Sequence, residues 1–144
     1  MGYQKLIYNF AENHALTILR VGIGLVFLLA GLHRIFFFSI GYQNFLDLGI
    51  LFATPLLIIT ILVEIICGFL LIINRFIIPA SLAIIALLAT GIIVSFVKAG
   101  YNFIEDINEL FILTATPTNI LLHITYLVGI LTLLLYSLSK KKEY

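Results

Sequence analysis

Charged side chains are scarce in this sequence: Asp, Glu, Lys and Arg make up 10% of its 144 residues, whereas 62% are hydrophobic. An average soluble domain carries about 25% charged residues. So few charges do not cover the surface of a water-soluble fold, which excludes that class. The high hydrophobicity also excludes intrinsic disorder. The formal net charge of +1 gives no electrostatic reason to expect nucleic-acid binding.

Cysteine occurs only once, as Cys67. A single cysteine excludes an internal disulfide, a Cys-x-x-Cys redox pair and a four-cysteine cluster. The three histidines are scattered and form no metal-ligand spacing with the acidic residues, so no metal site is predicted. The sequence also lacks a Ser/His/Asp set, a phosphate loop and a dinucleotide motif, and we therefore predict no catalytic residue.

Long hydrophobic runs dominate the chain. A helix crosses the ~30 Å hydrocarbon core of a bilayer with about 20 apolar residues. Barrel strands alternate apolar and polar residues, whereas these runs are apolar on every side, so helices are predicted. The first run is too long for the core of a signal peptide. We predict one domain, residues 1–144, an all-α integral membrane four-helix bundle with spans near 15–37, 52–73, 77–97 and 119–138.

Lysine and arginine in short loops set the orientation of membrane helices. Lys5, Arg75 and the run 140–142 fall on one side of a four-span chain, although Lys98 and Arg34 fall on the other. We therefore predict that both termini are cytoplasmic, at the plasma membrane if the host is prokaryotic. The final lysines also fit a dilysine retrieval signal in a eukaryotic host, but a basic cytoplasmic tail is the preferred interpretation.

The last outer loop is longer than the others. Apolar residues recur at helical spacing between Phe103 and Phe111, and Asn102 with Glu105 resembles a capping pair. We predict a short amphipathic helix on the outer interface, with an irregular loop as the alternative.

Small and polar residues gather on one side of each predicted span when successive residues are turned by about 100°. In membranes such a side faces other helices, because small residues let backbones approach and polar groups need partners. The glycines predicted to serve this packing are Gly24, Gly31, Gly68, Gly91 and Gly129.

Glu64 lies near the middle of the second span, where a charge costs about 2.5–3.5 kcal/mol. Arg20 lies just inside the first span, and both residues stand on the small-residue faces of their helices. We predict a buried Arg20–Glu64 pair, which either only holds the bundle together or also serves a ligand or a proton. The alternative is an Arg20 that reaches lipid phosphate and a protonated Glu64.

Other polar residues near the span ends are candidate ligand anchors. A shallow outer site beside the first span would suit a quinone head group, with interfacial histidines that bind nothing as the alternative. We expect His123 to lie among lipid headgroups and Cys67 to pack as a small hydrophobe. The candidate anchors are His33, Arg34, Thr60, Arg75 and Tyr136.

The sequence resembles the DoxX family of small four-span membrane proteins. The likeness lies in LRVGIGLVFLLAGLHRIF and in the spacing Glu64-x-x-x-Gly68 with Arg75 in the next turn. It covers about Leu19 to Ile93, and the fourth span fits by hydropathy alone. His33-Arg34 stands where family members often carry a Gly-x-x-Lys pattern.

This resemblance implies a link to membrane redox chemistry. The family includes the small subunit of a thiosulfate:quinone oxidoreductase and proteins associated with oxidative stress and thiol handling. Related four-span proteins act in methylamine dehydrogenase maturation, and a larger relative is a cargo receptor. The resemblance supplies no catalytic mechanism, but it points to Arg20, Gly24, Gly31, Glu64, Gly68 and Arg75.

We therefore predict an accessory or quinone-facing subunit of a membrane redox system rather than an independent enzyme. Its expected partners are the lipid bilayer and a redox protein, with a homo-oligomer left open. Its expected ligand is a quinone, and no cofactor is expected to be bound covalently. The alternatives are a small solute or proton-coupled transporter that uses Glu64, and a non-catalytic scaffold or assembly factor.

Overall fold

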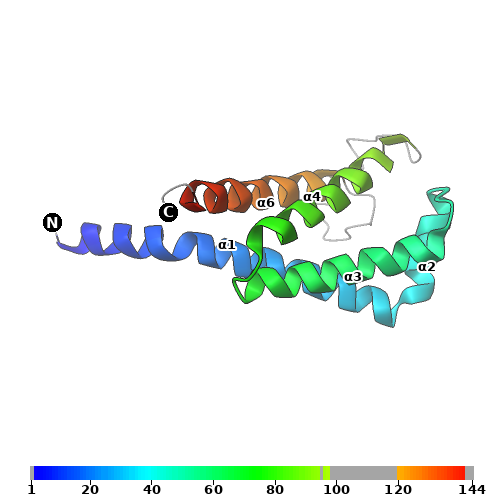
Figure 1. Cartoon of the computed structure of the whole chain (residues 1–144), viewed down its shortest axis with the longest axis horizontal. Helices are drawn as coiled ribbons and strands as arrows, with labels where there is room; N and C mark the ends of the chain where they lie inside the picture. Colours follow the sequence, from blue (N-terminus) through cyan, green and yellow to red (C-terminus); the bar gives the residue numbers. More distant parts are fainter. Residues whose placement is uncertain (1, 95, 98–119, 142–144) are drawn as a thin grey trace.

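The computed structural model describes residues 2–94, 96–97 and 120–141. In these ranges the chain forms helices and no strand (Figure 1). The helices are α1 (Gly2–Phe36), α2 (Phe38–Asp47), α3 (Ala53–Ile72), α4 (Ile77–Val94) and α6 (Ile120–Lys141).

Four of these helices are long and apolar enough to cross a membrane. This confirms the prediction of an all-α, four-span membrane protein. The predicted interfacial helix near Phe103–Phe111 lies outside the described residues. The candidate spans are His14–Phe36, Ala53–Ile72, Ile77–Val94 and Leu122–Ser139.

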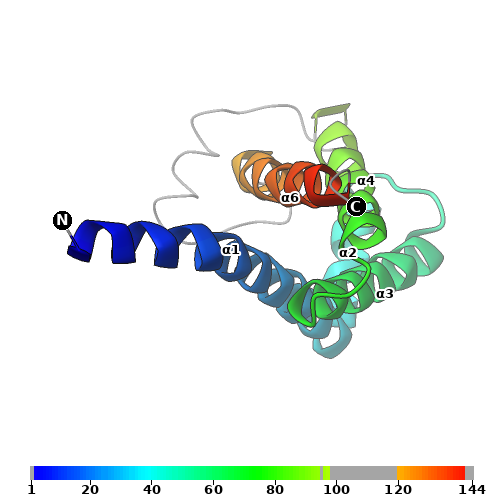
Figure 2. The ribbon, with the colours of Figure 1, turned by 60° about the vertical axis from the view of Figure 1, so that its left-hand side comes forward.

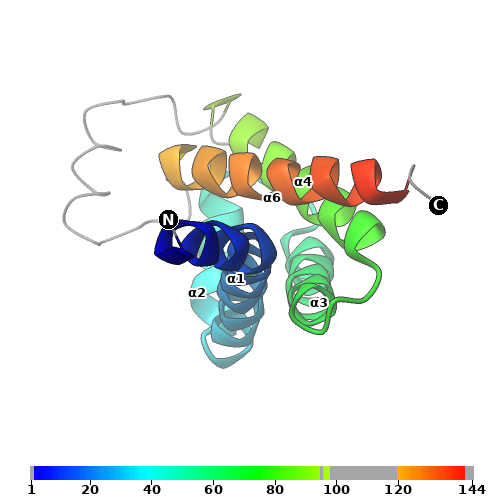
Figure 3. The same ribbon diagram turned by 90° about the vertical axis from the view of Figure 1, so that its left-hand side faces the viewer.

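The helices form two antiparallel pairs. α1 packs most extensively on α3, and α4 packs most extensively on α6. The end-on view shows the α4–α6 pair lying across the α1–α3 pair (Figure 3). Both chain ends and the α3–α4 turn lie toward one end of the bundle, which we call the terminal end, and α2 lies at the opposite end (Figure 1). The first part of α1 projects past the other helices (Figure 2).

Two helices end in the same hydrogen-bonded motif. At the end of α3, Asn74 has a left-handed backbone (φ 59°), and the N–H of Arg75 donates to the carbonyl of Leu70 at 3.0 Å. At the end of α2, Gly49 is left-handed (φ 66°), and the N–H of Ile50 donates to the carbonyl of Phe45 at 3.0 Å. This Schellman arrangement satisfies carbonyls that a helix end leaves open and reverses the chain sharply.

Helices α3 and α4 also begin alike. Phe52 (φ 61°) and Phe76 (φ 50°) each precede the first turn with a left-handed backbone. Pro55 and Pro79 follow in the first turn, where the missing N–H costs no helical hydrogen bond. The two positive-φ phenylalanines are strained positions for an aromatic residue, and the prolines after them help to fix where each helix starts.

Glycines bring α1 and α3 into backbone contact. A Cβ built on Gly68 would lie 2.7 Å from the carbonyl oxygen of Gly24 and 2.7 Å from the amide nitrogen of Leu28. A Cβ built on Gly31 would lie 3.1 Å from the Cβ of Glu64. No side chain fits between these helices, so all three glycines are needed for the observed separation.

The apolar core joins all four spans near the terminal end. The buried residues of α4 lie between Ala80 and Leu88 and those of α6 between Ile130 and Leu134. Phe27 of α1 meets the ring of Tyr126 edge-on at 5.9 Å. The core cluster consists of Ile23, Phe27, Cys67, Leu71, Ala80, Ile84, Leu88, Ile130 and Leu133.

Helix α2 was not predicted from the sequence. It has no buried residue, but Gly41 lies against the side chain of Leu57 in α3, where a Cβ on the glycine would come within 3.3 Å of it. Large apolar side chains cover the outside of the bundle, as at Ile18 (66% exposed) and Leu29 (60% exposed). Such a surface requires lipid around it.

The substitution Gly68→Ala tests the close contact between α1 and α3. Its methyl group would meet backbone atoms of Gly24 and Leu28, which cannot rotate away. We expect a loss of about 1–3 kcal/mol in the free energy of unfolding, the usual cost of overpacking an interior. The loss is measured by SDS titration in detergent micelles, followed by circular dichroism.

Gly22→Ala is the matched control. Nothing lies within 4 Å of the Cβ position of Gly22, and alanine is the better helix former. Its free energy of unfolding should be unchanged or slightly raised. Equal losses in Gly22→Ala and Gly68→Ala would contradict the backbone contact.

Candidate functional site

Glu64 lies in α3 on the side that faces α1 and is 3% exposed. It follows Leu57 and Ile61 at helical spacing and precedes Leu71 on the same buried face. Gly31 of α1 lies opposite Glu64, and the absence of a side chain there makes room for the carboxyl group. The site therefore begins with an acidic residue buried between two helices.

Arg34 of α1 is the partner of this carboxyl group. Its Nη1 donates a hydrogen bond to Oε1 of Glu64, which also makes an ion pair. The Arg34 side chain is 29% exposed and the Glu64 side chain 4%. Arg34 lies in the last turn of α1, where the helix dipole also favours a positive charge. The second carboxylate oxygen, Oε2, is buried and has no hydrogen-bond partner among the described residues.

The prediction that Glu64 pairs with Arg20 is wrong. Arg20 Nη1 instead donates to Oδ1 of Asn74, in the turn after α3. The antiparallel register places Gly31 beside Glu64 and Arg20 beside the end of α3. Glu64 and Asn74 are ~15 Å apart along the helix axis at a rise of 1.5 Å per residue, which puts Glu64 out of reach of Arg20.

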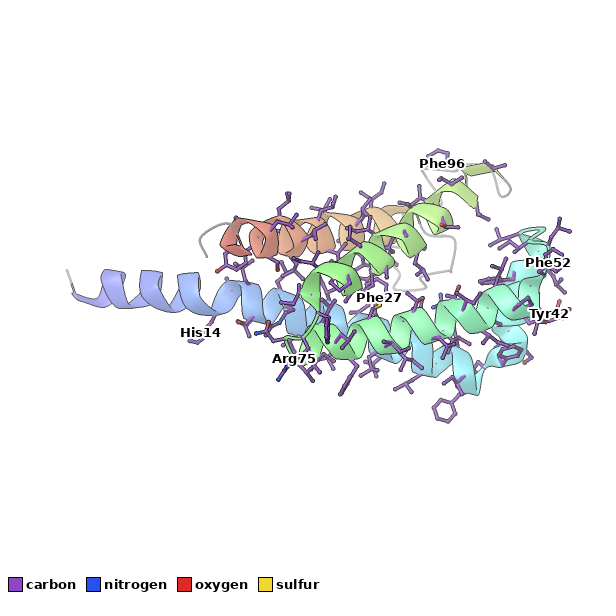
Figure 4. All side chains as sticks on the ribbon, in the orientation of Figure 1. His14, Phe27, Tyr42, Phe52, Arg75 and Phe96 are labelled. Carbon is purple, nitrogen blue, oxygen red and sulfur yellow. The ribbon has the colours of Figure 1, made fainter. Side chains whose placement is uncertain are left out.

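The predicted ligand anchors divide between the two ends of the bundle. Thr60 lies one turn before Glu64 and is half-buried, and His33 stacks on Phe37 with 4.6 Å between ring centroids. Arg75 lies at the α3–α4 turn, toward the terminal end (Figure 4). Tyr136 belongs to the second half of α6 and lies at that end too. Only His33, Arg34 and Thr60 therefore lie on the Glu64 side of the molecule.

His123 contacts a neighbouring helix near the start of the fourth candidate span. Its side chain is half-buried between α6 and α4, and a Cβ built on Gly91 would lie 3.0 Å from its Nε2. The ring therefore packs on the backbone of α4. The absence of a side chain on Gly91 makes this approach possible. Gly129 likewise leaves room for Ile23 of α1, because a Cβ built on Gly129 would lie 2.9 Å from Cδ1 of Ile23.

The end of the bundle that carries Arg34 has an apolar rim. Phe36, Leu51 and Phe52 are each 80% exposed, and Phe37 is 49% exposed. Phe52 and Tyr42 project at this end (Figure 4). In the sequence, Asp47 is the only charged residue between Arg34 and Glu64. This end of the bundle therefore presents a surface suited to lipid or to a hydrophobic molecule.

The pair offers two complementary kinds of hydrogen bond. An arginine has five N–H donors, of which Arg34 uses one on Glu64. A carboxylate oxygen accepts only, so Oε2 requires a donor. Among the residues that the structure describes, no three His, Cys, Asp or Glu side chains gather to hold a metal ion, and Cys67 is a buried free thiol.

A family model named DoxX matches residues 15–97, more than half of the chain. The chain belongs to the DoxX family. It is a multi-pass integral membrane protein of that family, with four candidate spans. The segment that matches DoxX begins at the start of the α1 span, reaches past α4 and includes both Arg34 and Glu64. No curated protein and no solved structure matches the chain.

Arg34→Gln tests the ion pair of this DoxX protein. It leaves the carboxylate of Glu64 buried without a cation, which we expect to lower the free energy of unfolding by about 2–3 kcal/mol. The double variant Arg34→Gln/Glu64→Gln should recover part of that loss, because no charge is then left unpaired. Unfolding of the four proteins in detergent gives the coupling energy directly.

Arg20→Gln is the comparison variant. It removes a hydrogen bond to the exposed residue Asn74, so we expect a loss of only about 1 kcal/mol that adds to the effect of Glu64→Gln. A coupling between positions 20 and 64 that exceeds the coupling between 34 and 64 would contradict the assigned pair.

Proposed function

We propose that the protein is a quinone-facing accessory subunit of a membrane redox system. The observation that carries this proposal is the Arg34–Glu64 pair, in the half of the bundle whose end exposes apolar and aromatic side chains. Ionisable residues inside a membrane are costly, and they usually mark a functional site. The pair would anchor a ligand, and the chemistry would belong to a partner protein.

The chemistry of Arg34 supports a quinone head group. A guanidinium donates hydrogen bonds to carbonyl oxygens, and the free donors of Arg34 lie on a side chain that is 29% exposed. Phe37 stands about one turn after Arg34 and offers exposed aromatic surface to a ring. Hydrophobic lining with a few polar anchors is typical of small-molecule sites.

The surroundings favour a ligand that arrives through the bilayer. The exposed residues Leu51 and Phe52, in the turn between α2 and α3, add apolar surface at the same end of the bundle. A lipid-soluble molecule with a polar head meets these conditions, whereas a charged solute from water does not. The family match supports a membrane role but does not name the ligand.

A second candidate function is proton-coupled transport, and the buried Glu64 favours it. A membrane carboxylate that gains and loses a proton is a common coupling group in transporters. In that case Glu64→Gln would abolish uptake by a folded protein in vesicles. In the redox role, the same variant would instead alter the bound ligand.

Purification of the tagged protein from its own membranes in mild detergent tests the redox role. We expect quinone in the extract, measured by chromatography per mole of protein, together with an oxidoreductase identified by mass spectrometry. Arg34→Gln should lower the quinone content several-fold and retain the oxidoreductase. Arg75→Gln, changed at the opposite end, is the control and should retain both. A quinone content equal in wild type and Arg34→Gln would contradict the proposed site.

We also propose that both termini are cytoplasmic, since Lys5, Arg75 and the run 140–142 lie on one side of the four spans. Cys67 is buried, and Cys67→Ala gives a background for single cysteines. In intact cells, a membrane-impermeant maleimide should label Asp47→Cys, and it should label Arg75→Cys only after permeabilisation. The reverse pattern would contradict the proposed orientation.

A further inference from the structure

One atom of the Arg34–Glu64 site has no partner in the described part of the chain. Glu64 Oε2 is buried without a hydrogen bond, while Oε1 accepts from Arg34. Buried polar groups are nearly always hydrogen-bonded, because an unmade bond is not replaced by water. Oε2 is such an acceptor, and it belongs to an ion pair whose other member, Arg34, is partly exposed. This combination points to a ligand that donates a hydrogen bond to Oε2.

The other two buried polar atoms without a partner can form a hydrogen bond close to where they lie. The hydroxyl of Ser81 can rotate onto a carbonyl of its own helix, as Thr90 does on Ala86 at 2.8 Å. Nε of Arg20 belongs to a half-buried side chain next to the exposed Asn74. The backbone N–H groups around Glu64 already donate within α3, so the donor that Oε2 requires must come from a side chain or from a ligand.

The ligand therefore needs two kinds of polar group. It needs an oxygen that accepts from the outward-facing donors of Arg34, and a hydroxyl that donates to Oε2 of Glu64. It also needs an apolar or aromatic body to lie against Phe37, which stands about one turn after Arg34. A hydroquinone carries both polar groups on one ring, whereas the oxidised quinone carries only acceptors.

We infer that the Arg34–Glu64 pair binds the hydroquinone form of its ligand in preference to the quinone form, an inference that rests on the proposed function. One ligand hydroxyl donates to Oε2, and Arg34 donates to an oxygen of the same ligand. The oxidised ligand still accepts from Arg34 but leaves Oε2 without a donor. A hydrogen bond to a charged acceptor corresponds to about a tenfold difference in affinity or more.

The ligand reaches Glu64 from the side of Arg34. The Arg34 side chain is 29% exposed and covers the carboxyl group, whose own side chain is 4% exposed. The flexible stem of an arginine lets its head group turn outward and still contact Oε1. This movement would uncover Oε2.

The experiment compares the two redox forms of one probe. The wild-type protein in lipid nanodiscs is dialysed to equilibrium, without oxygen, against a decyl-tailed benzoquinone or its hydroquinone. We expect the hydroquinone to bind about ten times more tightly than the quinone. In Glu64→Gln the ratio should fall toward one, because an amide offers both a donor and an acceptor and carries no charge.

Asp47→Asn is the matched control, since it neutralises an exposed acid on α2 and should keep the wild-type ratio. Equal affinity of the wild type for both forms would overturn the inference and leave the quinone-facing role intact. Binding of neither form would overturn both the hydroquinone preference and the quinone-facing role. Co-purification of an oxidoreductase would then test the accessory role on its own. Should Glu64→Gln fail to fold, the wild-type ratio alone decides the inference.

Discussion

An ionised carboxylate inside a membrane-crossing helix needs a cation beside it, and much of this structure follows from that requirement. Glu64 meets it through Arg34. The pairing requires α1 to run antiparallel to α3 in one register, and Gly31 to lack a side chain where the carboxyl group passes. Gly24 and Gly68 extend the same close contact by two turns. The two helices thus form one unit around the ion pair.

The position of α1 and α3 within the bundle leaves one side of the site buried and the other side partly exposed. The apolar core joins the four spans near the terminal end, whereas Arg34 lies toward the end that carries α2. One member of the pair is therefore enclosed, and the other borders a surface of exposed phenylalanine and leucine. A ligand that is mostly apolar and carries a small polar head suits this boundary.

The sequence predicted the fold well because hydropathy and length decide it. Each candidate span lies within a few residues of its predicted range, and the α3–α4 turn falls at Asn74, as its short length requires. The pairing of Glu64 was missed because Arg20 and Arg34 stand on the same face of α1, and periodicity does not give the register between two helices. Helix α2 was missed because it has only ten residues, too few to span a membrane, and buries none of them.

The most direct test of the account is a solid-state NMR measurement of the dipolar coupling between the guanidinium nitrogens of arginine and the carboxyl carbon of Glu64 in lipid bilayers. The account predicts a strong coupling in the wild type that disappears in Arg34→Gln and persists in Arg20→Gln. A coupling that persists in Arg34→Gln, or that disappears in Arg20→Gln, would contradict it.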